Sequence, residues 1–426
     1  HRDLHSFPTR RSSDLAEPPG AAPRAARWTS LAAALCAGAL TGALALGLWS
    51  QHWRRRELGR TPWDPRGADE TYAGSASCRE CHARFYELWS PSRHGKAMQP
   101  VTAALVQEAL SPLPEPLTVG ASRFAVDLDA REVVEEGPGG RRVHPMVHAL
   151  GGKNVFFFLT PGDRGRLQVL PLAYDVRRRE WFDTTGSMVR HFPDQPDAAL
   201  HWQDPLLTFN AACYNCHVSQ LESDYDALSD AYHTTWREPG INCEACHGPN
   251  QGHIRACRAA PEGTVPKDLR TIRWGGFSAA QANDACSPCH AKMRPLAPAF
   301  MPGDRFFDHY DLVCLEDRDF HPDGRDLGEN YTLTGWLMNP CAQSGALDCT
   351  HCHTSSGRFR QKDDPNSSCL PCHARRVRTI RSHSRHPQTA AAPTCVSCHL
   401  PMTEFSRMLR RDHSFRPPCP EAGERF

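Results

Sequence analysis

The stretch Cys-Glu-Ala-Cys-His, residues 243–247, is one of seven copies of a single five-residue pattern, and this repeat decides how the chain can fold. In each copy two cysteines stand three positions apart, and a histidine follows the second cysteine directly. Random placement of the 19 cysteines and 23 histidines would give only about 0.05 copies, so the repeat is not accidental. The copies are CRECH (Cys78, Cys81, His82), CYNCH (Cys213, Cys216, His217), CEACH (Cys243, Cys246, His247), CSPCH (Cys286, Cys289, His290), CTHCH (Cys349, Cys352, His353), CLPCH (Cys369, Cys372, His373) and CVSCH (Cys395, Cys398, His399).

This pattern is the attachment signature of c-type haem. Cysteines at positions i and i+3 share one face of a helical turn, so both thiols can form thioethers with the two vinyl groups of one porphyrin. The histidine at i+4 then lies under the ring and offers an imidazole nitrogen to the iron. Paired cysteines also make tetrahedral zinc sites, but zinc gives no reason for a histidine after every second cysteine. The sequence therefore predicts seven covalently attached haem c groups, each with a proximal histidine.

The cysteines outside the motifs are Cys36, Cys257, Cys314, Cys341 and Cys419. Cys36 lies in an apolar segment and is expected to behave as a small hydrophobic residue. Haem is attached to this motif outside the cytoplasm, in compartments where disulfides also persist. The other four cysteines could therefore form up to two disulfides or remain free thiols.

Arginine supplies 44 of the 49 basic residues. Its guanidinium binds carboxylates in a bidentate manner, and seven haems would add fourteen propionates to a chain whose formal charge is +1. A G+C-rich genome would produce the same bias, so both explanations stand. We find no basic stripe or motif that predicts binding to nucleic acid.

The N-terminal region predicts a membrane anchor. Residues 1–15 look like a translated adapter remnant and are set aside, and residues 16–27 form a short flank. Residues 28–51 contain no charge, which fits a transmembrane helix, with a cleaved signal peptide as the alternative. The arginines that follow favour a cytoplasmic C-terminal side, but haem attachment requires the opposite. We expect a single-pass inner-membrane protein with its haem domain in the periplasm.

The motifs divide the rest of the chain. The 130-residue interval between His82 and Cys213 contains β-rich runs such as FAVDLD and NVFFFL, separated by glycine-rich turns. We predict a mainly α fold with extensive loops, packed around seven haems, with a small β-rich insertion that scaffolds the first haem or binds a partner. The expected layout is a linker (52–74), a first haem segment (75–116), the insertion (117–190), a segment for haems two to four (191–300), a connector (301–345) and a segment for haems five to seven (346–426).

Apart from the seven motif histidines and the three in the N-terminal region, thirteen histidines could supply a second axial ligand to an iron. A free-standing histidine is more often a surface or hydrogen-bonded residue, so its position must single it out. His94 follows the first motif closely, and His253 stands six residues after His247, beyond a Gly-Pro turn. The candidates chosen in this way are His94, His253, His233, His383, His386 and His413, with one of His383 and His386 expected to bind. Met98 and His309 are weaker candidates.

Three elements resemble multihaem cytochromes of the cytochrome c-554-like kind: WSPSRHGKAM (89–98), CEACHGPNQGH (243–253), and CVSCHLPM followed by RRDHSF (395–415). The run at 148–175 is similar to the insert of such proteins, and several relatives continue into tetratricopeptide repeats that do not occur in this sequence. The resemblance covers most of residues 75–418. It implies a multihaem cytochrome c fold with mainly bis-histidine irons, and distal ligands at His94, His253 and His413. Departures near Cys341 and residues 354–356 direct the search for an open site to the haem on Cys349 and Cys352.

Three classes of function follow from these features. The first is an electron carrier that accepts electrons from a quinol dehydrogenase or soluble cytochrome and passes them to an acceptor, because six-coordinate iron exchanges electrons without binding substrate. The second is an oxidoreductase that acts on a small nitrogen or sulfur compound at one open haem. The third is a haem-bearing sensor or structural module. The predicted saturation of the irons favours the carrier.

Overall fold

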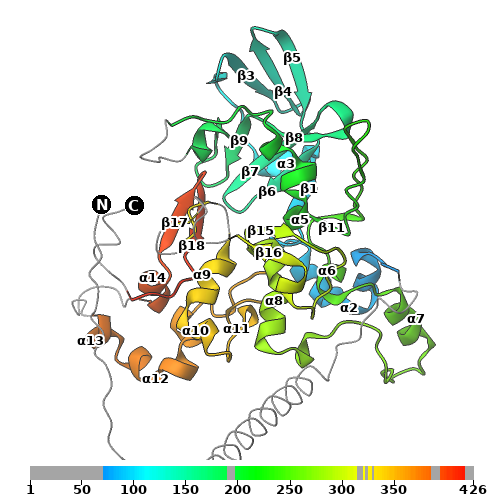
Figure 1. The fold of residues 1–426 in the computed structure, drawn as a ribbon, viewed down its shortest axis with the longest axis vertical. Helices are drawn as coiled ribbons and strands as arrows, with labels where there is room; N and C mark the ends of the chain where they lie inside the picture. The colour runs from blue at the N-terminus through cyan, green and yellow to red at the C-terminus, as the bar shows by residue number, and fades with distance from the viewer. Residues whose placement is uncertain are drawn as a thin grey trace, which may run out of the picture. The chain divides into compact units, whose positions relative to one another are not determined.

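The computed structural model describes residues 71–189, 197–313, 320–321, 325–328, 331–384 and 394–417. Strands from the first half of the described chain gather at the top of Figure 1, and the short helices that carry the motifs lie below them. The predicted segment 28–51, the candidate His386, and Cys36, Cys314 and Cys419 lie outside the described residues. Cys257 and Cys341 are free thiols.

The helices are short, and most of the longer ones carry a motif or flank one. Ser278 caps α8 by accepting from the Gln281 backbone, while the Gln281 side chain returns to Ser278, which fixes where this helix begins. The helices are α2 (Ser75–Trp89), α3 (Ala103–Ala109), α4 (Phe209–Ala212), α5 (Tyr214–His217), α6 (Glu244–His247), α7 (Gln251–Ala259), α8 (Ala279–His290), α9 (Thr332–Met338), α10 (Pro340–Gln343), α11 (Cys349–Cys352), α12 (Leu370–Arg378), α13 (Ile380–Ser384) and α14 (Cys395–His399).

Strands β1 to β10 form what we call the β-rich unit. A six-stranded sheet has the order β1-β6-β7-β9-β10, with β8 paired to β7, and a four-stranded meander runs β2-β3-β4-β5. These strands are β1 (Met98–Pro100), β2 (Leu117–Val119), β3 (Ser122–Asp127), β4 (Glu132–Gly137), β5 (Gly140–Pro145), β6 (His148–Gly151), β7 (Val155–Pro161), β8 (Leu167–Val169), β9 (Leu172–Asp175) and β10 (Glu180–Asp183).

Four further antiparallel pairs lie among the motif-bearing segments. They are β11 (Val218–Ser219) with β14 (Glu238–Pro239), β12 (Tyr225–Asp226) with β13 (Ala231–Tyr232), β15 (Met293–Pro295) with β16 (Tyr310–Leu312), and β17 (Met402–Phe405) with β18 (Met408–Arg411). The first three pairs lie in connections between motifs, β17–β18 follows the last motif, and each pair satisfies backbone groups that a loop would leave to solvent.

The prediction of a mainly α fold is wrong, because the structure is 34% helix and 23% strand. The motif helices are shorter than expected, as α5, α6 and α11 have only four residues each. The connections between motifs pair as strands instead. No helix in the described part of the chain, which does not include residues 28–51, has the length and apolar character that crossing a membrane would require.

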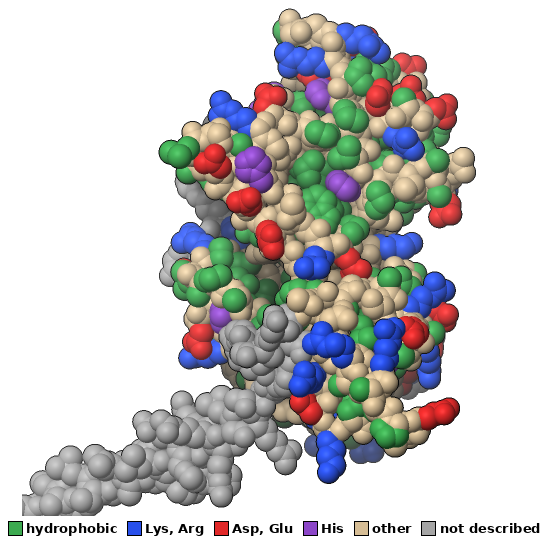
Figure 2. All heavy atoms as spheres, turned by 90° about the vertical axis from the view of Figure 1, so that its right-hand side faces the viewer, with side chains coloured by type: hydrophobic (Ala, Val, Ile, Leu, Met, Phe, Trp, Pro, Cys, Tyr) green, Lys and Arg blue, Asp and Glu red, His purple; other side chains and the backbone are tan. Residues whose placement is uncertain are grey.

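The main apolar core lies in the β-rich unit. Phe158, Leu170, Leu172 and Tyr174 are all fully buried there. Trp181 stacks on Phe158 with ring centroids 5.3 Å apart, and its indole N–H donates to the Ser111 carbonyl at 2.8 Å. On the molecular face of Figure 2, Lys and Arg side chains lie at the top and over the lower part, with hydrophobic side chains exposed between them. The β-rich unit thus has a protein core of its own.

Replacing Phe158 with alanine should destabilise the β-rich unit by about 3–5 kcal/mol, because a buried ring is lost and a cavity remains. Val143→Ala on β5 is the control, since Val143 is 40% exposed, and it should change stability by about 0.5 kcal/mol or less. Urea unfolding followed by far-ultraviolet circular dichroism measures both. Equal effects of the two substitutions would contradict the assigned core.

Candidate functional site

Each motif lies on a short helix that presents its two cysteines on one face and its histidine at the end of the turn. In α2 and α12 the chain continues past the motif, but the backbone leaves helical geometry at His82 and at His373. The remaining five motifs lie on α5, α6, α8, α11 and α14, and the helix ends within one residue of the histidine. The histidine therefore marks a break in every motif.

Cysteines of different motifs lie next to one another. The Cys216 thiol is 3.3 Å from the Cys289 carbonyl, and the Cys289 thiol is 3.3 Å from the Asn215 carbonyl. Burial raises the pKa of the Cys246 thiol to about 12, with the neighbouring Cys289 adding to the effect. Thiols of different motifs are also neighbours in three further pairs: Cys78 with Cys243, Cys286 with Cys349, and Cys369 with Cys395. The motifs are thus packed against one another rather than spaced along a rod.

Four motif histidines each face a second histidine across a gap. The ring centroids are 6.3 Å apart for His82 and His253, 6.3 Å for His94 and His290, 6.3 Å for His353 and His413, and 6.1 Å for His383 and His399. Two metal–imidazole bonds of about 2 Å each, together with the ring radii, span roughly 6 Å. Each gap therefore has the width of one metal ion held between two imidazoles.

Backbone carbonyls orient these rings. The Nδ1 atom of His94 lies 2.9 Å from the Ser355 carbonyl, and that of His413 lies 2.8 Å from the Arg411 carbonyl. A carbonyl only accepts, so Nδ1 carries the proton and Nε2 keeps its lone pair for a metal. The same arrangement occurs at His217 with Ala97, His247 with Ile272, His253 with Leu269 and His399 with Arg416.

Burial keeps five of the imidazoles at this site neutral. Desolvation lowers the pKa of His290 to about 4 and that of His413 to about 4, and it also lowers the pKa values of His94, His217 and His353. A protonated imidazole has no lone pair to give to a metal. At neutral pH these side chains are therefore in the form that binds iron.

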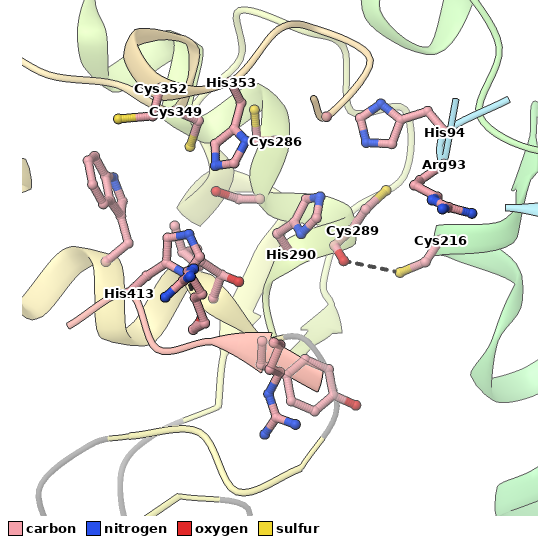
Figure 3. Close-up of a pocket in the computed structure, with 18 of the residues that line it drawn as sticks. Arg93, His94, Cys216, Cys286, Cys289, His290, Cys349, Cys352, His353 and His413 are labelled. Atoms are coloured by element: carbon pink, nitrogen blue, oxygen red, sulfur yellow. Dashed lines mark hydrogen bonds between the residues drawn. The ribbon is translucent and has the colours of Figure 1, made fainter. Parts of the chain in front are cut away.

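A cavity of about 3250 Å³ lies among the motifs, several times the roughly 300–1,000 Å³ of a pocket for a drug-sized ligand. Figure 3 shows His94 and His290 in this space, with His353 and His413 farther along it. Nine basic side chains and two acidic ones line the cavity, so it favours anionic ligands. Paired neutral imidazoles, flanking cysteines and basic walls together fit haem, with its iron, its vinyl groups and its propionates.

The predicted distal candidates have different positions in the structure. His94, His253, His383 and His413 each face a motif histidine. His233 does not face one among the described residues, and its backbone N–H donates to Asp224. The sequence pointed to the fifth motif as the open one, but His353 faces His413. Within the described ranges it is His217, His247 and His373 that face no second imidazole.

Glu244, inside the third motif, is a structural residue that the sequence analysis did not single out. It is 2% exposed, and its carboxylate accepts from the backbone N–H groups of Ala73 at 2.9 Å, Gly74 at 2.8 Å and Asn250 at 2.8 Å. It therefore ties the start of α2 to α6. The sequence gives no signal that distinguishes it from Glu80, which also lies between two motif cysteines but is exposed.

Comparisons with known proteins agree with this site. Residues 77–112 and 194–248 match the family "Cytochrome c554 and c-prime". The multiheme cytochrome MtrA of Shewanella baltica (strain OS185) is 22% identical over 162 residues, which make up 38% of this chain and 36% of MtrA. The crystal structure of the outer cell wall cytochrome OcwA shares the fold, with a TM-score of 0.52, 16% identity, and coverage of 83% of this chain and 81% of OcwA.

The site defines a protein that binds several haem groups through cysteine pairs and histidines. With the comparisons, it places the chain among the multihaem c-type cytochromes.

Glu244→Ala should destabilise the protein by at least about 3 kcal/mol, because it leaves three backbone donors without their charged acceptor. Glu80→Ala is the matched control: Glu80 pairs with Arg258 at 2.6 Å, but both side chains are more than 60% exposed, so the change should be about 1 kcal/mol or less. Urea unfolding midpoints of the haem-loaded proteins give both values. Similar midpoints for the two variants would show that Glu244 does not join these segments.

Proposed function

We propose that this protein carries electrons through seven covalently attached haems, between a respiratory donor and an acceptor outside the cytoplasm. The motif cysteines would hold the porphyrins, and the motif histidines would be the proximal ligands. The four facing imidazoles, His94, His253, His383 and His413, would complete the coordination of four irons.

The single observation that carries this proposal is the spacing of the four imidazole pairs at 6.1–6.3 Å. An iron held by two imidazoles has no vacant position for a substrate, so it exchanges electrons and does little other chemistry. Neutral rings held by backbone carbonyls need little rearrangement when the iron changes its charge, which favours fast electron transfer.

The contacts between motifs support a continuous path. Neighbouring cysteines link the motifs in the order first, third, fourth, fifth, sixth and seventh. The second motif is linked to the fourth. The porphyrins attached to these cysteines would lie edge to edge in the same order. Electrons could thus cross the protein without leaving the haems, and the second haem would be a side branch at the fourth.

The first motif is the favoured contact for a redox partner. Cys81 and His82 are exposed, and the nearby Phe85 ring is 69% exposed. A haem edge at the surface shortens the distance to a partner's cofactor. The partner would be a redox protein such as a quinol dehydrogenase or a soluble cytochrome. Thioether attachment, which takes place outside the cytoplasm, and the likeness to an outer cell wall cytochrome support an extracytoplasmic, periplasmic or outer location.

His217 favours a second candidate function, reduction or oxidation of a small nitrogen or sulfur compound. It borders the cavity and faces no second imidazole in the described part of the chain, while its Nδ1 atom is held at 2.6 Å by the Ala97 carbonyl. A haem on Cys213 and Cys216 would then have a face open to a small ligand, with Arg93 nearby in the cavity wall to attract an anion.

Protein produced with a c-type maturation system should carry seven covalent haems, because seven complete motifs are present. Intact-mass spectrometry under denaturing conditions measures the number, and pyridine haemochrome absorbance checks it. Cys395→Ala combined with Cys398→Ala should lower the count by one. A count of five or fewer in the unaltered protein, or zinc in stoichiometric amount, contradicts the proposal.

Oxidised protein should show low-spin ferric signals in electron paramagnetic resonance, and redox titration should give reversible steps over a wide range of potential, since paired imidazoles give low-spin iron. The reduced protein should be reoxidised by an acceptor cytochrome but only slowly by nitrite, hydroxylamine or tetrathionate. Rapid turnover of one of these compounds, together with a high-spin signal that is lost when Cys213 and Cys216 are replaced, would instead support the enzyme.

A further inference from the structure

The turn between β6 and β7 touches both of the chain segments that carry His94 and His413. It consists of residues 151–154, Gly-Gly-Lys-Asn, which connect two central strands of the β-rich unit. Gly151 has φ +87° and Gly152 has φ +98°, where an added Cβ would lie 2.8 Å from the Val155 carbonyl oxygen and 2.5 Å from the Phe156 ring. The turn therefore requires both glycines.

On one side the turn holds the segment of His94. The Arg93 guanidinium donates to the Gly152 carbonyl at 2.8 Å, and the Gly151 N–H donates to the Ala97 carbonyl at 3.0 Å. The chain then continues directly into β1, which pairs with β6 from Met98 opposite Leu150. His94 thus lies between two anchor points on the β-rich unit.

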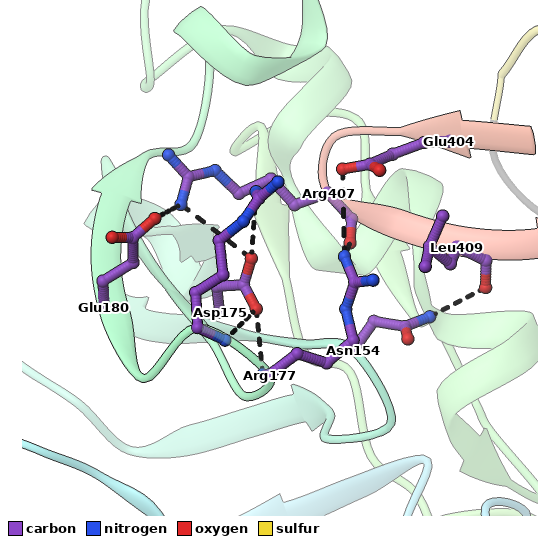
Figure 4. Close-up of polar contacts among 8 residues, drawn as sticks. Asn154, Asp175, Arg177, Glu180, Glu404, Arg407 and Leu409 are labelled. Atoms are coloured by element: carbon purple, nitrogen blue, oxygen red, sulfur yellow. Dashed lines mark hydrogen bonds and ion pairs between the residues drawn. The ribbon is translucent and has the colours of Figure 1, made fainter.

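On the other side the same turn holds the hairpin that precedes His413 (Figure 4). The Asn154 side chain donates to the Leu409 carbonyl at 2.9 Å, on strand β18. Two residues farther along, Arg411 ends that strand, and its carbonyl accepts from Nδ1 of His413 at 2.8 Å. The position of β18 therefore sets the group that orients the His413 ring.

Arg407, at the tip of the hairpin, is fixed by the β-rich unit. Its guanidinium pairs with Glu180 at 2.5 Å, lies 3.9 Å from the fully buried carboxylate of Asp175, and covers the Phe182 ring at 4.4 Å. Arg177 in turn donates to the Arg407 carbonyl at 3.2 Å. We call the contact of Asn154 with the hairpin, together with the contacts of Arg407 with the β-rich unit, the clamp.

His94 and His413 face histidines of two neighbouring motifs. His94 faces His290 of the fourth motif, His413 faces His353 of the fifth, and Cys286 and Cys349 of the same two motifs are neighbours. By contrast, His253 lies on α7 and His383 on α13, outside the β-rich unit. One part of the fold therefore serves two adjacent sites and not the other two.

We propose that the β-rich unit is a positioning device: its β6–β7 turn and its clamp set the orientation of the distal imidazoles, and through it the reduction potentials, of the fourth and fifth haems. This inference rests on the proposed ligation by His94 and His413. Arg93, Asn154 and Arg407 act through those histidines and are positioning residues. The hydrogen bond to Nδ1 and the angle between the two rings tune an axially ligated iron, so a displaced β18 changes the fifth haem without removing its ligand.

The test uses the full haem-loaded protein and compares low-spin signals in electron paramagnetic resonance with stepwise redox titration. His94→Ala and His413→Ala first assign the signals, because each should convert one haem from low-spin to high-spin. Arg407→Ala should then shift the signal and midpoint potential of the His413 haem, and Arg93→Ala those of the His94 haem. Arg407→Lys should restore much of the former, since it keeps the charge beside Glu180. Asn154→Asp, which keeps the shape but loses the donor, is a second test of the clamp if Arg407→Ala does not mature.

Arg164→Ala is the matched control, because Arg164 also belongs to the β-rich unit but pairs with Asp230, away from the hairpin. It should leave every signal unchanged, as should all clamp variants for the haems of His253 and His383. If His413→Ala produces no high-spin haem, the ligation in the proposed function fails. If it does, but the clamp variants leave the His413 signal unchanged or shift all four low-spin signals alike, the positioning inference alone is overturned.

Discussion

The lower part of this fold depends on a hollow that protein side chains do not fill. A cavity of about 3250 Å³ borders five complete motifs, and the helices around it are mostly one or two turns long. Helices of this length are not stable in water by themselves, and the short segments between the later motifs cannot bury much apolar surface. The porphyrins attached to the motif cysteines would supply the missing core. The same constraint accounts for the basic lining, because each buried porphyrin would bring two carboxylates that need partners.

Backbone carbonyls hold six of the imidazoles around these sites. This device fixes which nitrogen of each ring faces the metal. It also means that the residues whose carbonyls accept these bonds, such as Ser355, Leu269 and Ile272, contribute through their backbone and not their side chains. The backbone conformation therefore determines how the imidazoles are oriented, and a small movement of a loop would change the environment of an iron.

This dependence on backbone conformation explains which features the sequence could predict and which it could not. The repeated motif is local, so haem c as the cofactor and the helical turns that carry the motifs followed from spacing alone, while the proximal role of the motif histidines stays a prediction. The runs between residues 117 and 183 alternate clearly enough to indicate strands, and β2 to β10 occupy them. The pairs β15–β16 and β17–β18 have no such pattern and form because the chain returns on itself there. The meeting of His94 with His290 is likewise tertiary, so the sequence offered candidates but no partners. His233 was a candidate for similar reasons of sequence position, yet it faces no motif histidine in the described residues.

The two parts of the protein thus obtain their rigidity in different ways. The β-rich unit has a packed aromatic core around Phe158, Tyr174 and Trp181, which does not depend on any cofactor. The motif-bearing part would be ordered largely by its haems, so a ligand anchored only within it moves with them. His94 and His413 are anchored instead to the unit with its own core, which gives two adjacent sites a reference that the porphyrins do not control. In a row of closely packed haems, the charge on one haem shifts the reduction potentials of its neighbours. Anchoring to the β-rich unit would keep the difference between the reduction potentials of the fourth and fifth haems constant.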